Sequence, residues 1–237
     1  MTLYDLHVDK ELNRWHRAIV KDAGLFAHLA HNVQTHTQQL VPPKIQDAIT
    51  GAMETLVHTI LFGSGLITVP GNAEGMTLGE RDFLVSERFR SYQKAAVVQG
   101  VGFGAGGLLL GLADLPALMS IKIKFLFDSA KLYGFDPETP NERLFLLTVF
   151  QLAFSGRERR QEVFSILQNW DDTIVLPTNW EALQTEYRNY IDMAKFLQLL
   201  PVIGSVAGGT ANNSLMNQLK THTMNAYRMR ILGKRWD

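Results

Sequence analysis

The sequence predicts an all-α protein, folded as a helical bundle. Apolar residues follow a helical period over residues 44–61, and signals for the start of a helix recur later in the chain. Alternating apolar and polar residues, which are typical of half-buried strands, are nearly absent. Two glycine-rich windows without charged residues, 95–113 and 196–219, further predict a central pair of closely packed helices.

The first forty residues are predicted to form an N-terminal helical extension, residues 1–40. Within it, Trp15, Ile19, Phe26 and Leu29 are spaced to share one helical face. The two prolines that follow Val41 interrupt the pattern, because proline removes a backbone donor and clashes with the preceding turn. The main helical domain is therefore expected to comprise residues 41–237.

The helix predicted after this break is amphipathic and ends near Gly63. Its apolar positions follow the i, i+3, i+4 rule: Ile45, Ala48, Ile49, Ala52, Met53, Leu56, Val57, Ile60 and Leu61. The following segment, 66–76, contains one proline and two glycines and is predicted to be a loop.

Three capping boxes predict the starts of later helices. In the first, Thr77 and Glu80 satisfy each other's free backbone donors, and the helix should run to about Lys94. The segments 139–142 and 178–181 repeat the pattern, with Pro140 at the favoured first helical position of the second.

The region between the first two boxes should contain a helix from about Asp114 to Tyr133. Asp114 is predicted to cap its N-terminus, with Pro116 in the first turn. Gly134 should adopt the left-handed conformation that ends the helix, which lets the next residue fold back. Asp136, Glu142 and Arg143 are expected to form a network that stabilises the following turn and helix start.

The glycines of the two charge-free windows recur at a spacing that allows helix backbones to approach closely. The pairs are Gly100 with Gly104, Gly107 with Gly111, and Gly204 with Gly208. Residues 95–113 are just long enough to cross a bilayer, but Pro201 and Asn212 make the second window too polar for lipid. A packed pair of helices is therefore favoured over reversible membrane insertion and over a stable membrane span.

Composition argues against several classes of protein. The 237 residues carry 23 basic and 23 acidic side chains, so the balance offers no electrostatic case for nucleic acid or for an anionic membrane. The absence of cysteine excludes disulfides and thiolate sites, and the clustered His28, His31 and His36 have no carboxylate at ligand spacing. Neither a metal nor a cofactor is expected. No secretory signal is visible, so a cytoplasmic location is expected.

A possible dinucleotide fingerprint lies in the first window, at Gly102–Gly107. It fits GxGxxG, and Asp128 follows at about the distance of a ribose-binding carboxylate. However, Pro116 lies where the phosphate-binding helix should continue, and no further strand and helix units follow to complete a sheet. We therefore favour helix packing as the explanation of these glycines.

Several motifs taken together resemble the EcsC family. They are the first glycine window with Ala113-Asp114-Leu115-Pro116, then Tyr133-Gly134-Phe135-Asp136, Glu142-Arg143-Leu144, Leu200-Pro201-Val202-Ile203-Gly204 with Asn212, and Tyr227-Arg228 with Arg230. Their order and spacing are more specific than any one of them. The resemblance covers the chain from about Lys44 onward.

The resemblance implies an accessory role more than a reaction. The family takes its name from a gene beside the components of an ABC transport system, and it supplies no catalytic residue. We therefore expect a non-enzymatic accessory protein, cytoplasmic or peripheral to the inner membrane and linked to ABC transport or secretion. Its partner would be the membrane or a transporter complex. The alternatives are a hydrolase that uses Asp114 in a helical pocket, and a nucleotide-binding protein that uses Gly102–Gly107.

Overall fold

The computed structural model describes residues 2–21, 43–69, 73–113, 115–154, 157–173 and 209–236, and it confirms the all-α prediction. Every regular element in these ranges is a helix. In chain order they are α1 (Leu3–Lys21), α3 (Pro43–Phe62), α4 (Leu78–Ala113), α5 (Leu115–Tyr133), α6 (Pro140–Phe154), α7 (Arg157–Gln168), α8 (Trp170–Thr173) and α12 (Gly209–Ile231).

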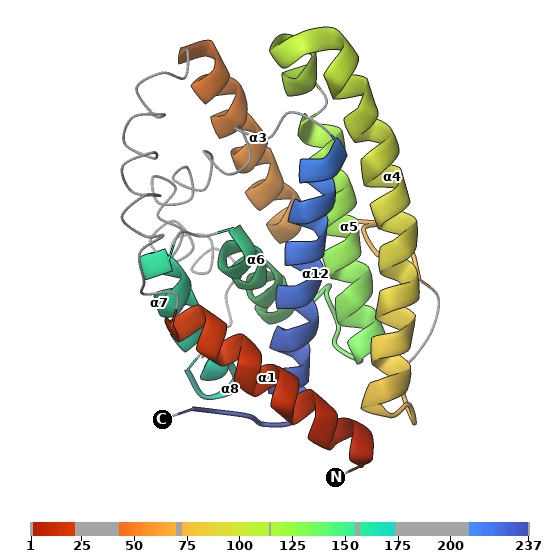
Figure 1. Cartoon of the computed structure of the whole chain (residues 1–237), viewed down its shortest axis with the longest axis vertical. Coiled ribbons are helices and arrows are strands. Elements are labelled where there is room, and N and C mark those ends of the chain that lie inside the picture. Colours follow the sequence, from red (N-terminus) through yellow and green to blue (C-terminus); the bar gives the residue numbers. More distant parts are fainter. Residues whose placement is uncertain are drawn as a thin grey trace.

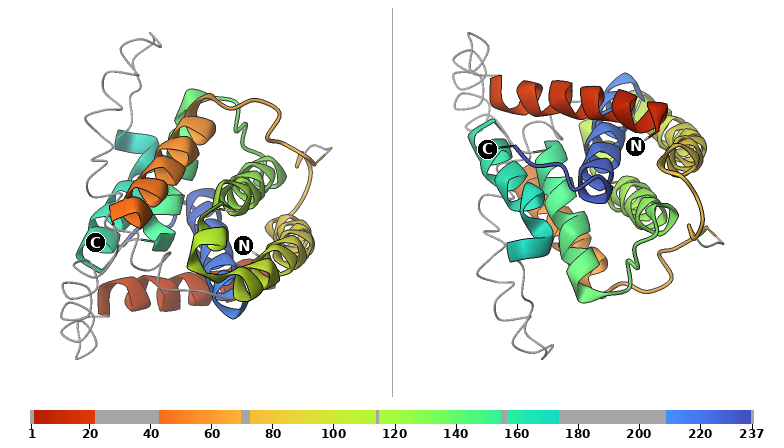
Figure 2. Two further views of the ribbon diagram at one scale, coloured as in Figure 1. Left: turned by 90° about the horizontal axis from the view of Figure 1, so that it is seen from above. Right: turned by 90° about the horizontal axis from the view of Figure 1, so that it is seen from below.

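The centre of the bundle is α12, which packs against α4, α5, α6, α1 and α7 (Figure 1). Its buried side chains belong to one hydrophobic core that also includes residues from every other helix of more than one turn. Helix α1 crosses the bundle on the outside, and it lies at the edge of the molecule in both views of Figure 2. Helix α12 therefore contacts most of the other described helices.

The first capping box is confirmed at the start of α4. The Glu80 carboxylate accepts a hydrogen bond from the Thr77 backbone N–H at 2.7 Å, and the Thr77 hydroxyl accepts one from the Glu80 N–H at 3.3 Å. The helix does not end near Lys94, as the sequence predicted, but continues for 36 residues to Ala113. No proline interrupts this stretch, and each interior glycine costs a helix only about 1 kcal/mol.

The predicted central pair of glycine-rich helices is only partly within the described structure. Residues 95–113, which include Gly100, Gly104, Gly107 and Gly111, form the second half of α4 instead of a separate helix. Pro201, Gly204 and Gly208 lie outside the described residues, as do the third capping box, the side chains of residues 96–118 and that of Asn212. Close packing of the two windows therefore stays a prediction.

The C-terminal end of α5 has the geometry predicted for Gly134. Its φ angle is 90°, and the Phe135 N–H donates to the carbonyl of Ala130 at 3.0 Å, which closes the last turn. Phe135 then folds back, with its ring 5.2 Å from that of Tyr227 in α12. A single left-handed residue thus ends one helix and directs the next side chain into the core.

We expect Gly134→Ala to lower the free energy of unfolding by about 1–2 kcal/mol, because a Cβ is disfavoured at this φ angle. The new atom would also lie 3.1 Å from Arg81 Nη1 and 3.2 Å from Ala73 Cβ. Gly51→Ala is the matched control, since Gly51 is an exposed position of α3 with nothing within 4 Å of an added Cβ. That change should stabilise by about 0.5–1 kcal/mol. Urea unfolding of both variants tests the pair, and shifts in the same direction would contradict the account.

The described part of the N-terminal segment is packed into the bundle. Val8, Leu12, Trp15 and Ile19 of α1 are buried in the common core, and α1 contacts α12, α7 and α4. The remainder of the segment, including Phe26, Leu29 and the three clustered histidines, lies outside the described residues. Among the helices that are described, none combines the length and apolarity needed to cross a membrane.

Candidate functional site

Three buried carboxylates stand out in the described structure, and each is surrounded by an arginine and at least one tyrosine. They belong to Asp82 in α4, Asp128 in α5 and Glu142 in α6. An ionised carboxylate away from water needs charged or hydrogen-bonding partners, so these partners determine what each group can do. We refer to the three arrangements as the Asp82, Asp128 and Glu142 clusters.

The Asp82 cluster joins four helices. Asp82 accepts hydrogen bonds from the Tyr4 hydroxyl of α1 at 2.5 Å, from Arg228 Nε of α12 at 2.9 Å, and from the Tyr133 hydroxyl of α5. Arg228 also pairs with Glu11 of α1 at 3.0 Å. The carboxylate therefore connects α4 with α1, α5 and α12 through short, directional bonds.

Burial and the neighbouring Asp82 raise the pKa of Tyr4 to about 12, and burial also raises the pKa of Tyr133 well above its ordinary value. Both hydroxyls therefore keep their protons at neutral pH and act as donors. With two hydroxyl donors and a guanidinium directed at it, Asp82 has its acceptor sites largely occupied by the protein itself. This arrangement is typical of a structural connection.

The Glu142 cluster lies beside the first. Glu142 accepts a hydrogen bond from Tyr227 and pairs with Arg230 Nη1 at 2.7 Å, and Arg230 also pairs with Asp171 at 2.9 Å. Burial raises the pKa of Glu142, although the positive charge of Arg230 opposes this. The ring of Tyr227 stacks on that of Tyr133 at 4.9 Å, so the Asp82 and Glu142 clusters form one continuous network around α12.

The second capping box is consequently only half formed. The Thr139 hydroxyl accepts a hydrogen bond from the Glu142 N–H at 3.3 Å, but the Glu142 side chain is directed to α12 instead of returning to Thr139. The predicted network of Asp136, Glu142 and Arg143 likewise forms without the Glu142 carboxylate. Asp136 accepts from the N–H of Glu138 at 3.1 Å, and Glu138 pairs with Arg143 at 2.7 Å.

Arg143 closes the C-terminal end of α3. Its Nη1 donates to the carbonyl of Gly63 at 2.8 Å and to that of Ile60 at 3.2 Å. The last carbonyls of a helix have no partner within the helix, and a cation there also interacts favourably with the helix dipole. Arg143 thus joins the start of α6 to the end of α3.

The Asp128 cluster anchors the chain that follows α3. Asp128 accepts from the Thr68 backbone N–H and hydroxyl, both at 2.6 Å, from the Tyr92 hydroxyl at 2.7 Å and from Arg88 Nε at 2.8 Å. A role in binding ribose, as the possible dinucleotide fingerprint required, is therefore wrong for Asp128, because its oxygens are already used.

The structure of Gly102–Gly107 also argues against a nucleotide-binding protein. Gly102–Gly107 lie inside α4, and the residues before them are helical as well, so the strand, turn and helix of that fingerprint are not formed. Asp114, the candidate catalytic residue and N-cap, lies outside the described residues, and both assignments stay predictions. Pro116 is the second residue of α5, within the first turn as predicted.

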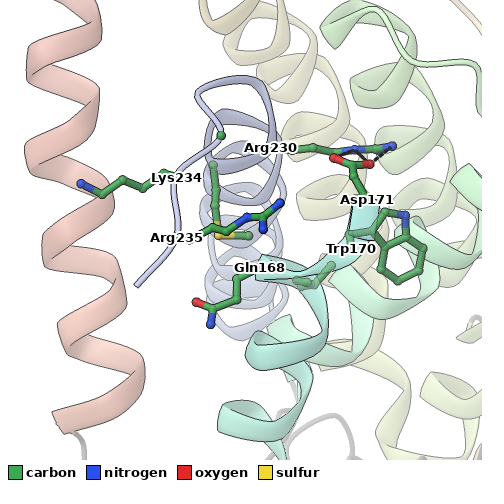
Figure 3. Close-up of a pocket in the computed structure, with 9 residues that line it drawn as sticks. Gln168, Trp170, Asp171, Arg230, Lys234 and Arg235 are labelled. Carbon is green, nitrogen blue, oxygen red and sulfur yellow. Dashed lines mark hydrogen bonds and ion pairs between the residues drawn. The ribbon is translucent and has the colours of Figure 1, made fainter. Parts of the chain in front are cut away.

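A small hollow lies between the α7–α8 junction and the C-terminal residues of the chain (Figure 3). It holds about 30 Å³, room for a molecule the size of water, whereas pockets for small organic ligands measure roughly 300–1,000 Å³. Two of its cations are already paired, Arg230 with Asp171 and Lys234 with Asp9 at 2.7 Å. The hollow therefore does not provide a substrate pocket.

The pairing of Asp82 with Arg228 was not predicted from sequence, although the sequence contains one signal for it. Asp82 occupies the same helical stripe as Leu78, Val85 and Phe89, all of which are buried. A carboxylate on an apolar stripe requires a buried partner. The stripe identifies the residue but not the partner, which lies 146 positions away in the chain.

Comparison with known proteins agrees with the structure that α1 is part of the same domain as the later helices. A family model described as the EcsC protein family matches residues 7–232, so it includes most of α1 and starts well before Lys44. Protein EcsC of Bacillus subtilis strain 168 is 39% identical over 223 residues, which cover 94% of each chain. The uncharacterised protein YdbA of the same bacterium is 31% identical over 147 residues, covering 60% of this chain and 54% of YdbA. No solved structure matches the chain.

Proposed function

The chain belongs to the EcsC protein family, and from this premise we propose that it is a non-enzymatic accessory protein of membrane transport. It works at the inner face of the membrane, beside an ABC transporter. The support for the link to transport is the family's context, since the family takes its name from a gene beside the components of such a system. The support for a role without catalysis comes from the carboxylate clusters.

The role without catalysis is supported by the partners of the buried carboxylates. A general acid or base must reach a reacting atom with a free oxygen or proton. Asp82, Asp128 and Glu142 instead direct their oxygens at arginine and tyrosine side chains of neighbouring helices. Each cluster joins elements that are distant in sequence, as expected for residues that stabilise a scaffold.

Cross-linking in cells tests the proposal. The full chain, with an affinity tag, is expressed in its own host, and membranes are separated from the soluble fraction before and after cross-linking. We expect a portion of the chain to sediment with the inner membrane and to form cross-links with the subunits of an ABC transporter. Free tag, expressed at the same level, is the control. Complete recovery in the soluble fraction, with no transporter cross-link, would refute the proposal.

A further inference from the structure

The charges of α1 are segregated between its two faces. Its acidic residues are used within the molecule: Asp5 accepts from the N–H of Thr2 at 2.6 Å, Asp9 pairs with Lys234, and Glu11 pairs with Arg228. These contacts hold the helix start and fix α1 on the C-terminal part of the chain. Asp9 and Glu11 are thereby paired with cations, and Asp5 is held by the backbone at the helix start.

The opposite face of α1 is basic. At about 100° per residue, Lys10, Arg14 and Arg17 lie within a sector of roughly 120° that contains no acidic residue. All three side chains are exposed, and none of them forms an ion pair with a carboxylate in the described part of the chain. Among the described residues, Arg17 donates to the backbone carbonyl of Asn13, at 3.2 Å. Within the described ranges, the face thus presents positive charge without a carboxylate partner.

Apolar side chains lie in the same sector and are also exposed. The exposed fraction is 87% for Leu3, 47% for Leu6 and 46% for Val20. Leu3 and Leu6 precede the three cations, and Val20 follows them. We call the six residues Leu3, Leu6, Lys10, Arg14, Arg17 and Val20 the outer face of α1. Helix α1 lies at the edge of the molecule (Figure 2). Its buried side chains, Val8, Leu12, Trp15 and Ile19, lie on the side opposite the outer face, so the outer face is directed away from the bundle.

We propose that the outer face of α1 binds anionic phospholipid, with its cations at the headgroups and its leucines at the boundary of the acyl chains. The proposal rests on the membrane part of the proposed function and identifies the surface that makes the contact. Helices that lie in the plane of a membrane interface combine lysine and arginine at the headgroups with apolar side chains at the acyl boundary. The outer face of α1 carries both kinds of side chain. Cations close to an anionic leaflet each strengthen binding.

Lipid fits this face better than nucleic acid does. A phosphate backbone would engage the three cations but would leave Leu3, Leu6 and Val20 in water. A membrane accepts both kinds of side chain, because charge and apolar surface meet at the level of the headgroups. The combination therefore favours lipid, and nucleic acid becomes an outcome that the test distinguishes.

Vesicle flotation with the purified full chain tests the proposal. We expect the chain to float with vesicles that contain phosphatidylglycerol and not with vesicles of phosphatidylcholine alone, with weaker binding at higher salt. Each basic residue contributes about fivefold to such binding, so K10Q/R14Q/R17Q should bind roughly 100-fold more weakly. The triple variant R90Q/K94Q/K124Q makes the same change in net charge on other helices and should bind like the parent. Helical circular dichroism verifies that both variants fold.

Three outcomes would overturn the proposal. They are unchanged binding of K10Q/R14Q/R17Q, equal loss in the control variant, and binding to a DNA or RNA duplex that is tighter than binding to the anionic vesicles. The proposed function is tested separately, in cells. If the chain cross-links to a transporter but does not float with anionic vesicles, the accessory role stands and the lipid-binding face is wrong.

Discussion

Replacing Asp82 with alanine lowers the free energy of unfolding by about 3–5 kcal/mol, the range found when one partner of a buried ion pair is removed. The change leaves Arg228 Nε and the hydroxyls of Tyr4 and Tyr133 without their acceptor in a site where Asp82 is only 3% exposed. Because a typical domain is stable by only 5–15 kcal/mol, this is a large fraction of the total. Urea unfolding, followed by circular dichroism, measures it.

The matched control is Glu87→Ala, on the same helix. Glu87 forms an exposed ion pair with Arg90 three residues away, and such pairs contribute about 0.5 kcal/mol or less. Asp82→Asn retains one acceptor oxygen and should lose less than the alanine variant, which keeps the comparison informative if Asp82→Ala does not fold. An Asp82→Ala variant no less stable than Glu87→Ala would show that the Asp82 cluster does not hold the helices together.

Acidification from pH 6.5 towards pH 3 should destabilise the protein by about 4 kcal/mol through His222 alone. Burial, together with the nearby positive charge of Arg160, lowers the pKa of His222 from 6.5 to about 3. Above pH 6.5 the imidazole is neutral in both states, so it has no effect on stability. Below that value the unfolded chain binds a proton that the folded chain does not, at a cost of about 1.4 kcal/mol per pH unit.

The geometry of His222 explains why the folded state resists protonation. Its Nδ1 accepts a hydrogen bond from Trp15 Nε1 at 3.2 Å in the core between α12 and α1, and a proton on Nδ1 would break this bond. His222→Asn offers the indole an oxygen acceptor but does not titrate. Between pH 6 and 4 the stability of the parent should therefore fall more steeply than that of the variant. Parallel pH profiles for the two proteins would contradict this assignment.

The helix boundaries that could be predicted from sequence depend on residues close together in the chain. The capping box of Thr77 and Glu80 and the left-handed turn at Gly134 are examples, because their hydrogen bonds span three to five residues. The extension of α4 beyond Lys94 was missed for a related reason. The loss of charged residues and the rise in glycine after Lys94 change what the helix can pack against, but they do not end the helix.

The carboxylate clusters and the outer face of α1 could not be predicted, because both depend on tertiary partners. Which acidic residues of α1 are neutralised is determined by Arg228 and Lys234, which lie more than 200 positions away. A net charge of zero thus conceals a helix with three exposed cations gathered on one side. Glu142 shows the same effect. Its local motif predicted that the side chain caps α6, but the carboxylate pairs with Arg230 of α12 instead.

The claim that the outer face of α1 contacts the membrane is tested most directly with a fluorescent label on this helix. The chain contains no cysteine, so Leu6→Cys and Lys94→Cys each provide a single attachment site for an environment-sensitive dye. On addition of phosphatidylglycerol vesicles, the emission of the dye at position 6 should shift to shorter wavelength, as its surroundings become apolar, while that at position 94 stays unchanged. No shift at position 6, or equal shifts at both positions, would contradict the account.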